Sequence, residues 1–528
     1  MTKNPIITGF NPDPSIIRVK DDYYIACSTF EWFPGVQIHH SRDLVNWKLI
    51  TRPLDHVRLL DMRGVPDSCG VWAPCLSYQD GTFYLVYSNV KSFDGLWKDT
   101  PNYLVTSKNI KGPWSDPIFL SSKGFDGSLF HDDDGRKYYL SLVVDHRDGK
   151  FFGGIMIQEY DSKFKCLSGK AKYIFYGSDL GITEGPHLYK KDGYYYLLTA
   201  EGGTEYGHAV TICRSKDIFG PYELHPDNPI LSASGKSEHP LQRSGHGDFT
   251  WTKDDRCFLV YLGSRPLMPE QKCTLGRETC IDEIHWPEGE WPSLKSGLKL
   301  PSLDLANLPL KDAINEDELI DFSKDDKLSI SYQSLRVPID TSWVNLNMNR
   351  GILSLKGRDS LASCFDQSLL ARRVKHFNID YEVSLSFEPE SFQQMAGLVC
   401  YYNTGHHYYL HLMGDDLSDK KYINLIQTDK FESTELLENY IDVSNQDLVH
   451  FKVEWRSKLL AFYYSLDGLR WILLKDKLDA CILSDDHVRE GSDRYQPAFT
   501  GSFVGIACQD LCGLSIQAHF LKLFYKSY

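Results

Sequence analysis

A turn followed by an aromatic-rich strand recurs five times in the first part of the chain, and this repeat constrains the fold more than any other feature. The copies begin at Asp21, Gly81, Gly135, Asp192 and Asp254, which lie 54 to 62 residues apart. In three copies a second element with a closing aromatic residue follows about 20 residues later. These second elements are Ser41–Trp47, Ser107–Trp114 and Ser215–Tyr222.

A hairpin, a polar turn and a closing aromatic strand make one four-stranded blade, and five blades make a closed propeller with protected edges. The alternative is a β-sandwich with chance similarity between its strands. We favour the propeller because the copies agree in spacing as well as in type.

The repeat stops near His285, and the remaining chain has a different pattern. A stretch with scattered Pro and Leu residues and the acidic run Asn315–Glu318 indicate a connector. Beyond it, short alternating strands predict a two-sheet sandwich of jelly-roll type. Its predicted strands include Leu353–Leu355, Tyr381–Leu385, Ala396–Tyr401, Phe451–Trp455 and Leu460–Tyr464. We therefore expect an all-β protein with a propeller in residues 1–310, a connector in residues 311–324 and a sandwich in residues 325–528.

Size and charge limit the partners of the chain. At 528 residues it is too long for one hydrophobic core. Its 57 basic and 71 acidic residues give a net charge of −14, which argues against nucleic acid or an anionic membrane and suits a neutral sugar. No apolar run approaches the roughly 20 residues that span a bilayer, and the first residues lack the apolar core of a signal peptide.

The 13 cysteines are scattered, without the paired spacing of a metal site. Several of them, such as Cys27, Cys257 and Cys400, lie inside apolar strand-like runs. They indicate reduced core residues and therefore a cytoplasmic protein, with an extracellular disulfide framework as the alternative.

Three carboxylic acids lie in stiff or small-residue settings. Asp13 stands between two prolines, Asp126 lies in Gly124–Ser128, and Glu184 lies in Thr183–His187. Each precedes a copy of the repeat, so the three acids take matched positions at the entry strands of blades one, three and four. Entry strands of a propeller surround its axis, so we expect the three side chains to converge there. A protonated acid facing a carboxylate is what hydrolysis of a glycosidic bond needs.

Each acid-bearing segment alone is more often an ordinary turn than a catalytic element. Three acids at matched repeat positions favour the catalytic interpretation. A non-catalytic sugar-binding propeller is the alternative from another class of function.

A set of motifs distributed over the chain resembles glycoside hydrolase family 43, in the β-xylosidase branch that carries a C-terminal β-sandwich. The matching segments are Gly9–Ser15, Ser28–Val36, Val71–Pro74, Gly124–Asp126, Thr183–His187, Ala200–Thr204, Leu275–Thr279, Ser391–Gln394 and Phe499–Phe503. The similarity runs nearly from end to end. The stretch Pro266–Cys273 matches no motif of the family.

The resemblance implies an inverting mechanism. Asp13 is then the general base that activates water, and Glu184 is the general acid that protonates the leaving oxygen. Asp126 is expected to orient Glu184 and to raise its pKa through like charge. The base and the acid are expected to lie roughly 6.5–9.5 Å apart, because a water molecule must fit between base and sugar.

The resemblance also implies substrate contacts. Phe30 and Trp72 form an apolar wall, with blade core as the alternative role. Arg277 hydrogen-bonds sugar hydroxyls, with pairing to Glu278 as the alternative, and Thr204 adds a polar contact. Two further residues complete the implied set, namely His246, which faces the pocket and could hold a calcium ion or water, and Phe499, which reaches over the pocket from the sandwich unless it only packs inside it.

The expected function is an exo-acting 1,4-β-xylosidase that releases D-xylose from the non-reducing end of xylo-oligosaccharides. An α-L-arabinofuranosidase, or both activities in one pocket, is the nearest alternative, and a retaining fructan-acting propeller is a more distant one. We expect no required cofactor, with a structural calcium ion left open because one imidazole is a poor calcium site. By the resemblance, we also expect a homodimer or homotetramer.

Overall fold

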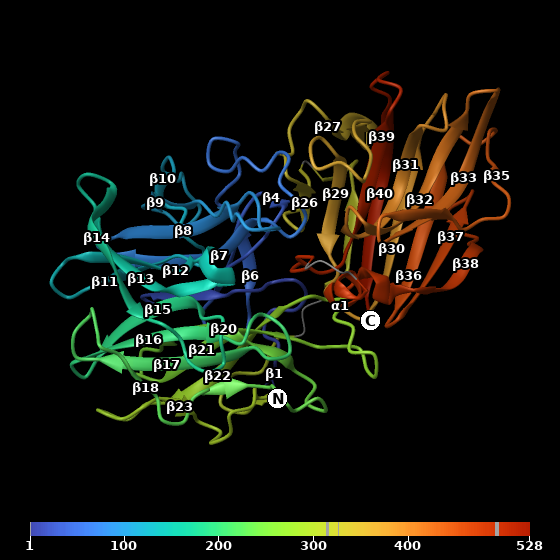
Figure 1. The fold of residues 1–528 in the computed structure, drawn as a ribbon. Helices are drawn as coiled ribbons and strands as arrows, with labels where there is room; N and C mark the ends of the chain where they lie inside the picture. Colours follow the sequence, from blue (N-terminus) through green and yellow to red (C-terminus); the bar gives the residue numbers. More distant parts are fainter. Residues whose placement is uncertain (1, 313–315, 326, 492–495) are drawn as a thin grey trace.

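The computed structural model describes residues 2–312, 316–325, 327–491 and 496–528, and these residues form two β-rich bodies that lie side by side (Figure 1). The first body consists mainly of five antiparallel sheets, and the second is built on two larger ones. Helices in the described ranges are few and short, namely α1 (Asp485–Arg489) and the 3₁₀ turns η1 (Arg147–Gly149), η2 (Met348–Arg350) and η3 (Ala480–Leu483). None of these helices has the length and hydropathy of a membrane span. The predicted all-β fold class, a propeller followed by a sandwich, is confirmed.

The first body is a five-bladed propeller. Blades one and two contain β2 (Ser15–Val19), β3 (Asp22–Cys27), β5 (Gln37–Ser41) and β6 (Lys48–Thr51), then β7 (Gly70–Gln79), β8 (Thr82–Val90), β9 (Asn102–Ser107) and β10 (Ile118–Ser121). Blade three contains β11 (Ser128–His131), β12 (Lys137–Val144), β13 (Phe152–Asp161) and β14 (Cys166–Phe175). Blade four contains β15 (Glu184–Lys191), β16 (Tyr194–Glu201), β17 (Ala209–Ser215), β18 (Glu223–Leu224) and β19 (Leu231–Ser232), and blade five contains β20 (Gln242–Trp251), β21 (Cys257–Ser264), β22 (Glu278–His285) and β23 (Ser293–Leu294).

All five copies of the repeat begin at the turn between the first and second strands of a blade. Asp21 directly precedes β3, for example, and Asp254 lies between β20 and β21. Neighbouring residues of a strand face opposite sides of its sheet, so the aromatic residues of the second strand pack on both faces. In β12, for example, Tyr138 and Tyr139 belong to two different hydrophobic clusters. The register of the repeat is therefore the register of the blades.

The N-terminal segment closes the ring by running along β22 of blade five. The backbone N–H of Ile6 donates to the Thr279 carbonyl at 2.9 Å, and that of Asn11 donates to the Arg277 carbonyl at 2.9 Å. At the chain start, β1 (Thr2–Lys3) pairs with β24 (Asp304–Leu305). Asp13 follows Asn11 by two residues, so this segment places Asp13 next to Arg277.

The second body is a sandwich of two antiparallel sheets. One sheet contains β25 (Glu318–Asp321), β27 (Val344–Asn347), β28 (Ile352–Lys356), β30 (Asn378–Ser386), β36 (Val449–Arg456), β37 (Leu459–Ser465), β38 (Ile472–Asp479) and β40 (Gln517–Ser527). The other contains β4 (Trp32–Phe33), β26 (Tyr332–Leu335), β29 (Ser368–Arg373), β31 (Gln394–Asn403), β32 (His406–Asp415), β33 (Ser418–Asp429), β34 (Glu432–Glu435), β35 (Ile441–Asp442) and β39 (Phe503–Asp510). Each of the five strands predicted from the sequence lies within one of these strands.

One strand, β4, lies in the propeller part of the sequence but pairs with a strand of the sandwich. β4 is in the loop between the second and third strands of blade one, yet it pairs with β26 of the sandwich. The indole of Trp32 stacks on the ring of Phe503 with centroids 3.6 Å apart and an interplanar angle of 12°. Both rings are buried, so the propeller and the sandwich share one hydrophobic core at this seam.

The predicted connector is shorter than residues 311–324. β25 pairs with β40, and Ile320 is buried in the sandwich core because its side chain lies on the inner face of that sheet. Residues 313–315 of the predicted connector lie outside the described residues.

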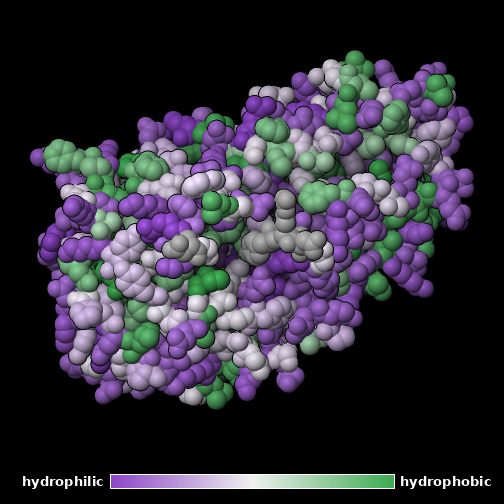
Figure 2. Space-filling model, viewed as in Figure 1, coloured by the Kyte–Doolittle hydropathy of each residue, from purple (hydrophilic) through white to green (hydrophobic). Residues whose placement is uncertain are grey.

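On the face seen in Figure 2, hydrophobic residues lie in small groups separated by polar ones.

Candidate active site

A pocket of about 500 Å³ lies at the hub of the propeller, where the blades meet the sandwich. All nine site residues named from the sequence line it, although they are spread over nearly the whole chain. These residues are Asp13, Phe30, Trp72, Asp126, Glu184, Thr204, His246, Arg277 and Phe499. Convergence of the three acids at one hollow is what the blade positions imply, because Asp13 and Asp126 each lie two residues before an entry strand and Glu184 begins one.

Four of the nine site residues named from the sequence have left-handed backbone conformations. The φ angles are 54° at Asp13, 52° at Phe30, 55° at Asp126 and 45° at His246. Non-glycine residues reach this region only where the surrounding structure enforces it, and such residues cluster at functional sites. All four side chains line the pocket.

Two donors hold the carboxylate of Asp13. Ser28 donates its hydroxyl hydrogen to Asp13 Oδ2 at 2.6 Å, and Arg277 Nη1 lies 3.3 Å from Asp13 Oδ1. The Ser28 hydroxyl oxygen in turn accepts the backbone N–H of Ala73 at 2.7 Å. Asp13 is 6% exposed, so its carboxylate is fixed in orientation but reachable from the pocket.

Glu184 has the electrostatics of a proton donor. Burial is the main cause that raises its pKa from 4.5 to about 7, the negative charge of Asp13 raises it further, and Arg277 opposes both. A carboxyl with a pKa near 7 keeps its proton in part of the molecules at neutral pH. The pair of Asp13 and Glu184 therefore offers one carboxylate and one carboxylic acid in the same pocket.

The expected effect of Asp126 on Glu184 needs a correction. The raised pKa of Glu184 was predicted to come from the like charge of Asp126, but burial is its largest cause and the charge of Asp13 comes next. Burial and then the charge of Glu184 raise the pKa of Asp126 itself well above its usual range. Asp126 Oδ2 also accepts the backbone N–H of Gly185 at 3.1 Å, which ties it to the residue after Glu184.

His246 lies between the acids. Its Nδ1 atom is 3.6 Å from Asp13 Oδ1 and 4.0 Å from Asp126 Oδ2. Burial lowers the pKa of His246 to about 4, so the ring is neutral at neutral pH. Gly185 leaves space for the ring, because a Cβ atom there would lie 2.7 Å from His246 Nε2.

Arg277 points into the pocket and does not pair with Glu278. Its Nη1 donates to Thr204 Oγ1 at 2.6 Å, and its Nη2 donates to the Phe499 carbonyl at 3.1 Å. Its Nε has no hydrogen-bond partner among the described residues. Glu278 instead accepts two hydrogen bonds from Arg265, at 2.6 and 2.8 Å.

Aromatic rings form one wall of the pocket. The Trp72 ring centroid lies 5.9 Å from that of Phe30, 5.2 Å from that of Phe125 and 5.3 Å from that of Phe499. Phe93 and Phe151 extend the wall, with centroids 5.9 Å apart. A stack of ring faces and edges of this kind suits the apolar face of a pyranose.

Several lining residues were not predicted from the sequence, namely Phe93, Lys98, Phe125, Phe151, Ile182 and Glu205. Phe125 was part of a quoted motif and could have been chosen as the neighbour of Asp126. Phe93, Lys98 and Phe151 lie in loops between strands, where neither the repeat nor an alternating pattern marks them.

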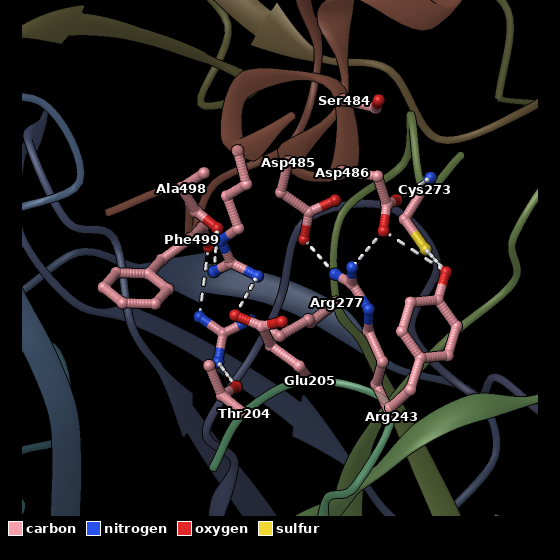
Figure 3. A network of polar contacts seen from close by, with 12 residues as sticks. Thr204, Glu205, Arg243, Cys273, Arg277, Ser484, Asp485, Asp486, Ala498 and Phe499 are labelled. Carbon is pink, nitrogen blue, oxygen red and sulfur yellow. Dashed lines mark hydrogen bonds and ion pairs between the residues drawn. The ribbon is translucent and has the colours of Figure 1, made fainter. Parts of the chain in front are cut away.

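A polar clamp joins the pocket rim to the sandwich (Figure 3). Arg243, which is almost fully buried, forms ion pairs with Asp485 and Asp486 of α1. Arg489 of the same helix pairs with Glu205 at 2.9 Å and donates from Nη2 to the Ala498 carbonyl at 2.7 Å. The clamp therefore fixes the residue that precedes Phe499.

The stretch Pro266–Cys273, which matched no motif, packs against the sandwich and does not line the pocket. The backbone N–H of Cys273 donates to Asp486 Oδ2 at 2.7 Å, and Gln271 accepts the Tyr206 hydroxyl at 2.8 Å through its carbonyl. Lys272 forms an ion pair with Glu490, just after α1. This stretch is thus part of the contact between the two bodies.

Comparison with known proteins gives matches over the whole chain. A family model described as Glycosyl hydrolases family 43 matches residues 2–292, and one described as Beta xylosidase C-terminal Concanavalin A-like domain matches residues 320–526. Xylosidase/arabinosidase 43B of Humicola insolens is 46% identical over 99% of this chain and 97% of its own length. Beta-xylosidase of Bacillus subtilis is 46% identical over 99% of each chain. The crystal structure of xylan beta-1,4-xylosidase from Bacillus halodurans C-125 matches with a TM-score of 0.95 and 47% identity over 100% of both chains.

Proposed function

The chain belongs to glycosyl hydrolase family 43, and from this premise we propose that it is an exo-acting, inverting 1,4-β-xylosidase. Its substrate is a short xylo-oligosaccharide, from whose non-reducing end it releases D-xylose. The observation that carries the proposal is the single pocket in which Asp13, Glu184 and Asp126 meet Arg277 and an aromatic wall. Full-length relatives named as xylosidases support the substrate class.

In the proposed reaction, Asp13 takes a proton from a water molecule, whose oxygen attacks the anomeric carbon from one side of the ring. Glu184 gives its proton to the glycosidic oxygen on the other side, and the bond between that oxygen and the anomeric carbon breaks. The product sugar carries the water oxygen in the inverted configuration. Asp126, which accepts the Gly185 N–H, positions the segment that bears Glu184.

Substrate orientation in this proposal comes from two kinds of contact. The rings of Trp72 and Phe30 pack against the apolar face of the terminal xylose, and Arg277 donates to its hydroxyls. Phe499, which the sandwich contributes, closes one side of the pocket. A closed side favours cleavage at chain ends over cleavage inside a chain.

Proton NMR of the first product tests the mechanism. With a β-linked substrate, α-D-xylose is expected before mutarotation, and initial β-D-xylose would contradict inversion and favour a retaining enzyme. Asp13→Asn and Glu184→Gln are each expected to lower kcat for xylobiose by about 10²–10⁴-fold. If both variants are folded and keep wild-type turnover, Asp13 and Glu184 are not the base and the acid. If the folded wild type itself shows no turnover of xylobiose, the propeller is a sugar-binding module and not a hydrolase.

An α-L-arabinofuranosidase activity in the same pocket is the second candidate. Its support is the Humicola insolens relative, which is named as a xylosidase/arabinosidase. Comparison of kcat/KM for 4-nitrophenyl β-D-xylopyranoside and 4-nitrophenyl α-L-arabinofuranoside separates the two. A higher value for the arabinofuranoside would reverse the assignment.

We further propose that hydrolysis needs no metal ion. His246 has two carboxylates within 4.0 Å in the described part of the chain, and both belong to the acid–base set. This donor set does not fit calcium, which takes six or more oxygen ligands. Activity that survives dialysis against EDTA supports the proposal, and activity restored only by calcium contradicts it.

We also propose a cellular location and an oligomeric state for the enzyme. We place it in the cytoplasm, because all 13 cysteines are free thiols and 10 of these are buried in the structure, as suits a reducing compartment. We expect a homodimer or homotetramer, by analogy with the family. Light scattering on the purified protein tests the assembly, and a monomer would contradict it.

A further inference from the structure

A cluster of two histidines and one aspartate lies in the sandwich, away from the pocket residues. His406 begins β32, Asp429 ends the neighbouring strand β33, and His487 belongs to α1. One potential ligand atom from each residue lies within 4.8 Å of the others. The three residues come from segments up to 81 positions apart, so the fold and not the local sequence brings them together.

The protonation of His406 is fixed by its neighbours. Asn403 Oδ1 accepts the backbone N–H of Gly405 at 3.0 Å, which identifies that atom as the amide oxygen. His406 Nδ1 lies 2.9 Å from the same oxygen and must therefore donate its hydrogen. In the neutral ring, Nε2 is then left with a lone pair and no hydrogen.

That lone pair faces another acceptor. His406 is fully buried, and its Nε2 has no hydrogen-bond partner among the described residues. The nearest charged atom to it is Asp429 Oδ1 at 3.7 Å, which also accepts and does not donate. Two acceptors that face one another in a largely buried place are unfavourable unless a metal ion or a shared proton lies between them.

His487 completes the arrangement. Its Nε2 lies 2.8 Å from Asp429 Oδ1, and the two imidazole rings are nearly perpendicular, at 85° with centroids 5.9 Å apart. Tetrahedral zinc with bonds of about 2.0–2.1 Å separates its ligand atoms by about 3.4 Å. The two distances to Asp429 Oδ1, 3.7 and 2.8 Å, lie on either side of this value, and the distance between the two imidazole nitrogens is at most 4.8 Å.

We propose that His406 Nε2, Asp429 and His487 bind a divalent first-row transition metal ion of the zinc class. Two imidazoles and one carboxylate are ligands that zinc prefers, and water takes the fourth position. When the ion binds, His487 changes tautomer: Nε2 gives up its hydrogen to solvent and Nδ1 takes one up, so that the ring stays neutral. The shared carboxylate oxygen then turns to the metal. Asn403 is the outer hydrogen-bond partner that orients His406.

The side chains of Asp429 and His487 are 29% and 16% exposed, which leaves the ion a way in. The site is structural in character, since it lies outside the pocket described above. It would join the ends of β32 and β33 to α1, the helix whose Asp485 and Asp486 hold Arg243 of the propeller. Metal binding would therefore strengthen the contact that positions Phe499.

The test uses the full chain without a polyhistidine tag. The protein is stripped with EDTA, dialysed against micromolar Zn²⁺ and passed through gel filtration, and bound zinc is measured by mass spectrometry. We expect about one zinc per chain, and affinity at least about tenfold lower in His487→Gln and in Asp429→Asn. With Co²⁺ in place of zinc, the wild type should give the visible absorption bands of a tetrahedral site, and both variants should lose them.

His285→Gln, which changes an exposed histidine at the end of β22, is the matched control and should keep the wild-type stoichiometry. Melting temperatures in EDTA establish that each variant is folded, and two variants are used so that the failure of one to fold does not decide the result. A wild type that binds no zinc would overturn the proposal. A shared proton between His406 and Asp429 would then be the remaining explanation of their close approach. Folded variants that keep the wild-type zinc content and cobalt spectrum would overturn it as well.

Discussion

Replacement of Glu184 by glutamine should make the protein more stable as it makes it inactive. The pKa of Glu184 is raised from 4.5 to about 7, chiefly by burial, and one unit corresponds to about 1.4 kcal/mol. A rise of about 2.5 units therefore means that ionisation of Glu184 costs the folded state at most about 3.5 kcal/mol. Because the side chain is partly exposed to the pocket, solvent screening reduces the expected cost to about 1–2 kcal/mol.

The sign follows from the direction of the shift. The pKa is higher in the folded state than in the unfolded state, so the wild type loses this stability as the pH rises from about 4.5 through about 7. Glutamine does not titrate. The stability advantage of Glu184→Gln over the wild type should therefore grow by about 1–2 kcal/mol between pH 5 and pH 8. The loss of like charge beside Asp126 acts in the same direction.

Urea unfolding at the two pH values, followed by tryptophan fluorescence, measures this difference. Glu288→Gln is the matched control, because Glu288 is exposed at the turn after β22 and should show no pH-dependent gain. An equal stability difference at pH 5 and pH 8 for Glu184→Gln would refute the argument that burial keeps this group protonated. A gain at pH 8 together with loss of turnover is the result expected of a buried catalytic acid.

Three further outcomes are expected. For the wild type, kcat/KM for xylobiose should fall about tenfold per pH unit above pH 7 as Glu184 loses its proton, and a profile that is flat to pH 9 would contradict this role. Phe499→Ala should raise KM for 4-nitrophenyl β-D-xylopyranoside about 3- to 10-fold through the loss of one aromatic contact, whereas an unchanged KM would mean that the ring does not touch substrate. Arg243→Ala leaves Asp485 and Asp486 without their buried partner and should lower the free energy of unfolding by about 3–5 kcal/mol; a loss below about 1 kcal/mol in urea titrations would show that the clamp is dispensable.

The blades and the three acids were predictable because the relevant signal is local and repeated. Each blade carries its own turn and aromatic strand, so a count of copies gives the number of blades. Asp13, Asp126 and Glu184 could be placed at the axis because each stands in the same relation to its own copy. Equivalent positions in a ring of blades face a common centre, so the three side chains converge at the axis.

The clamp and the outer pocket were not predictable for the converse reason. Arg243 and Asp485 are 242 residues apart and lie in different bodies. The sequence around either residue contains no pattern that predicts their contact. Phe93 and Phe151 belong to loops whose course depends on neighbouring blades. The leading part of burial in the raised pKa of Glu184 was not predictable either, because burial is a property of the assembled pocket.

The strand shared between the two bodies has a consequence for dissection of the enzyme. A gene cut before β25 would yield a propeller with a bare β4 edge and the Trp32 indole uncovered where it now lies against Phe503. Such a fragment has an unpaired strand edge and an exposed aromatic surface, both of which promote aggregation. The two modules are therefore best regarded as inseparable halves of one folding unit, and any chimaera should exchange them together.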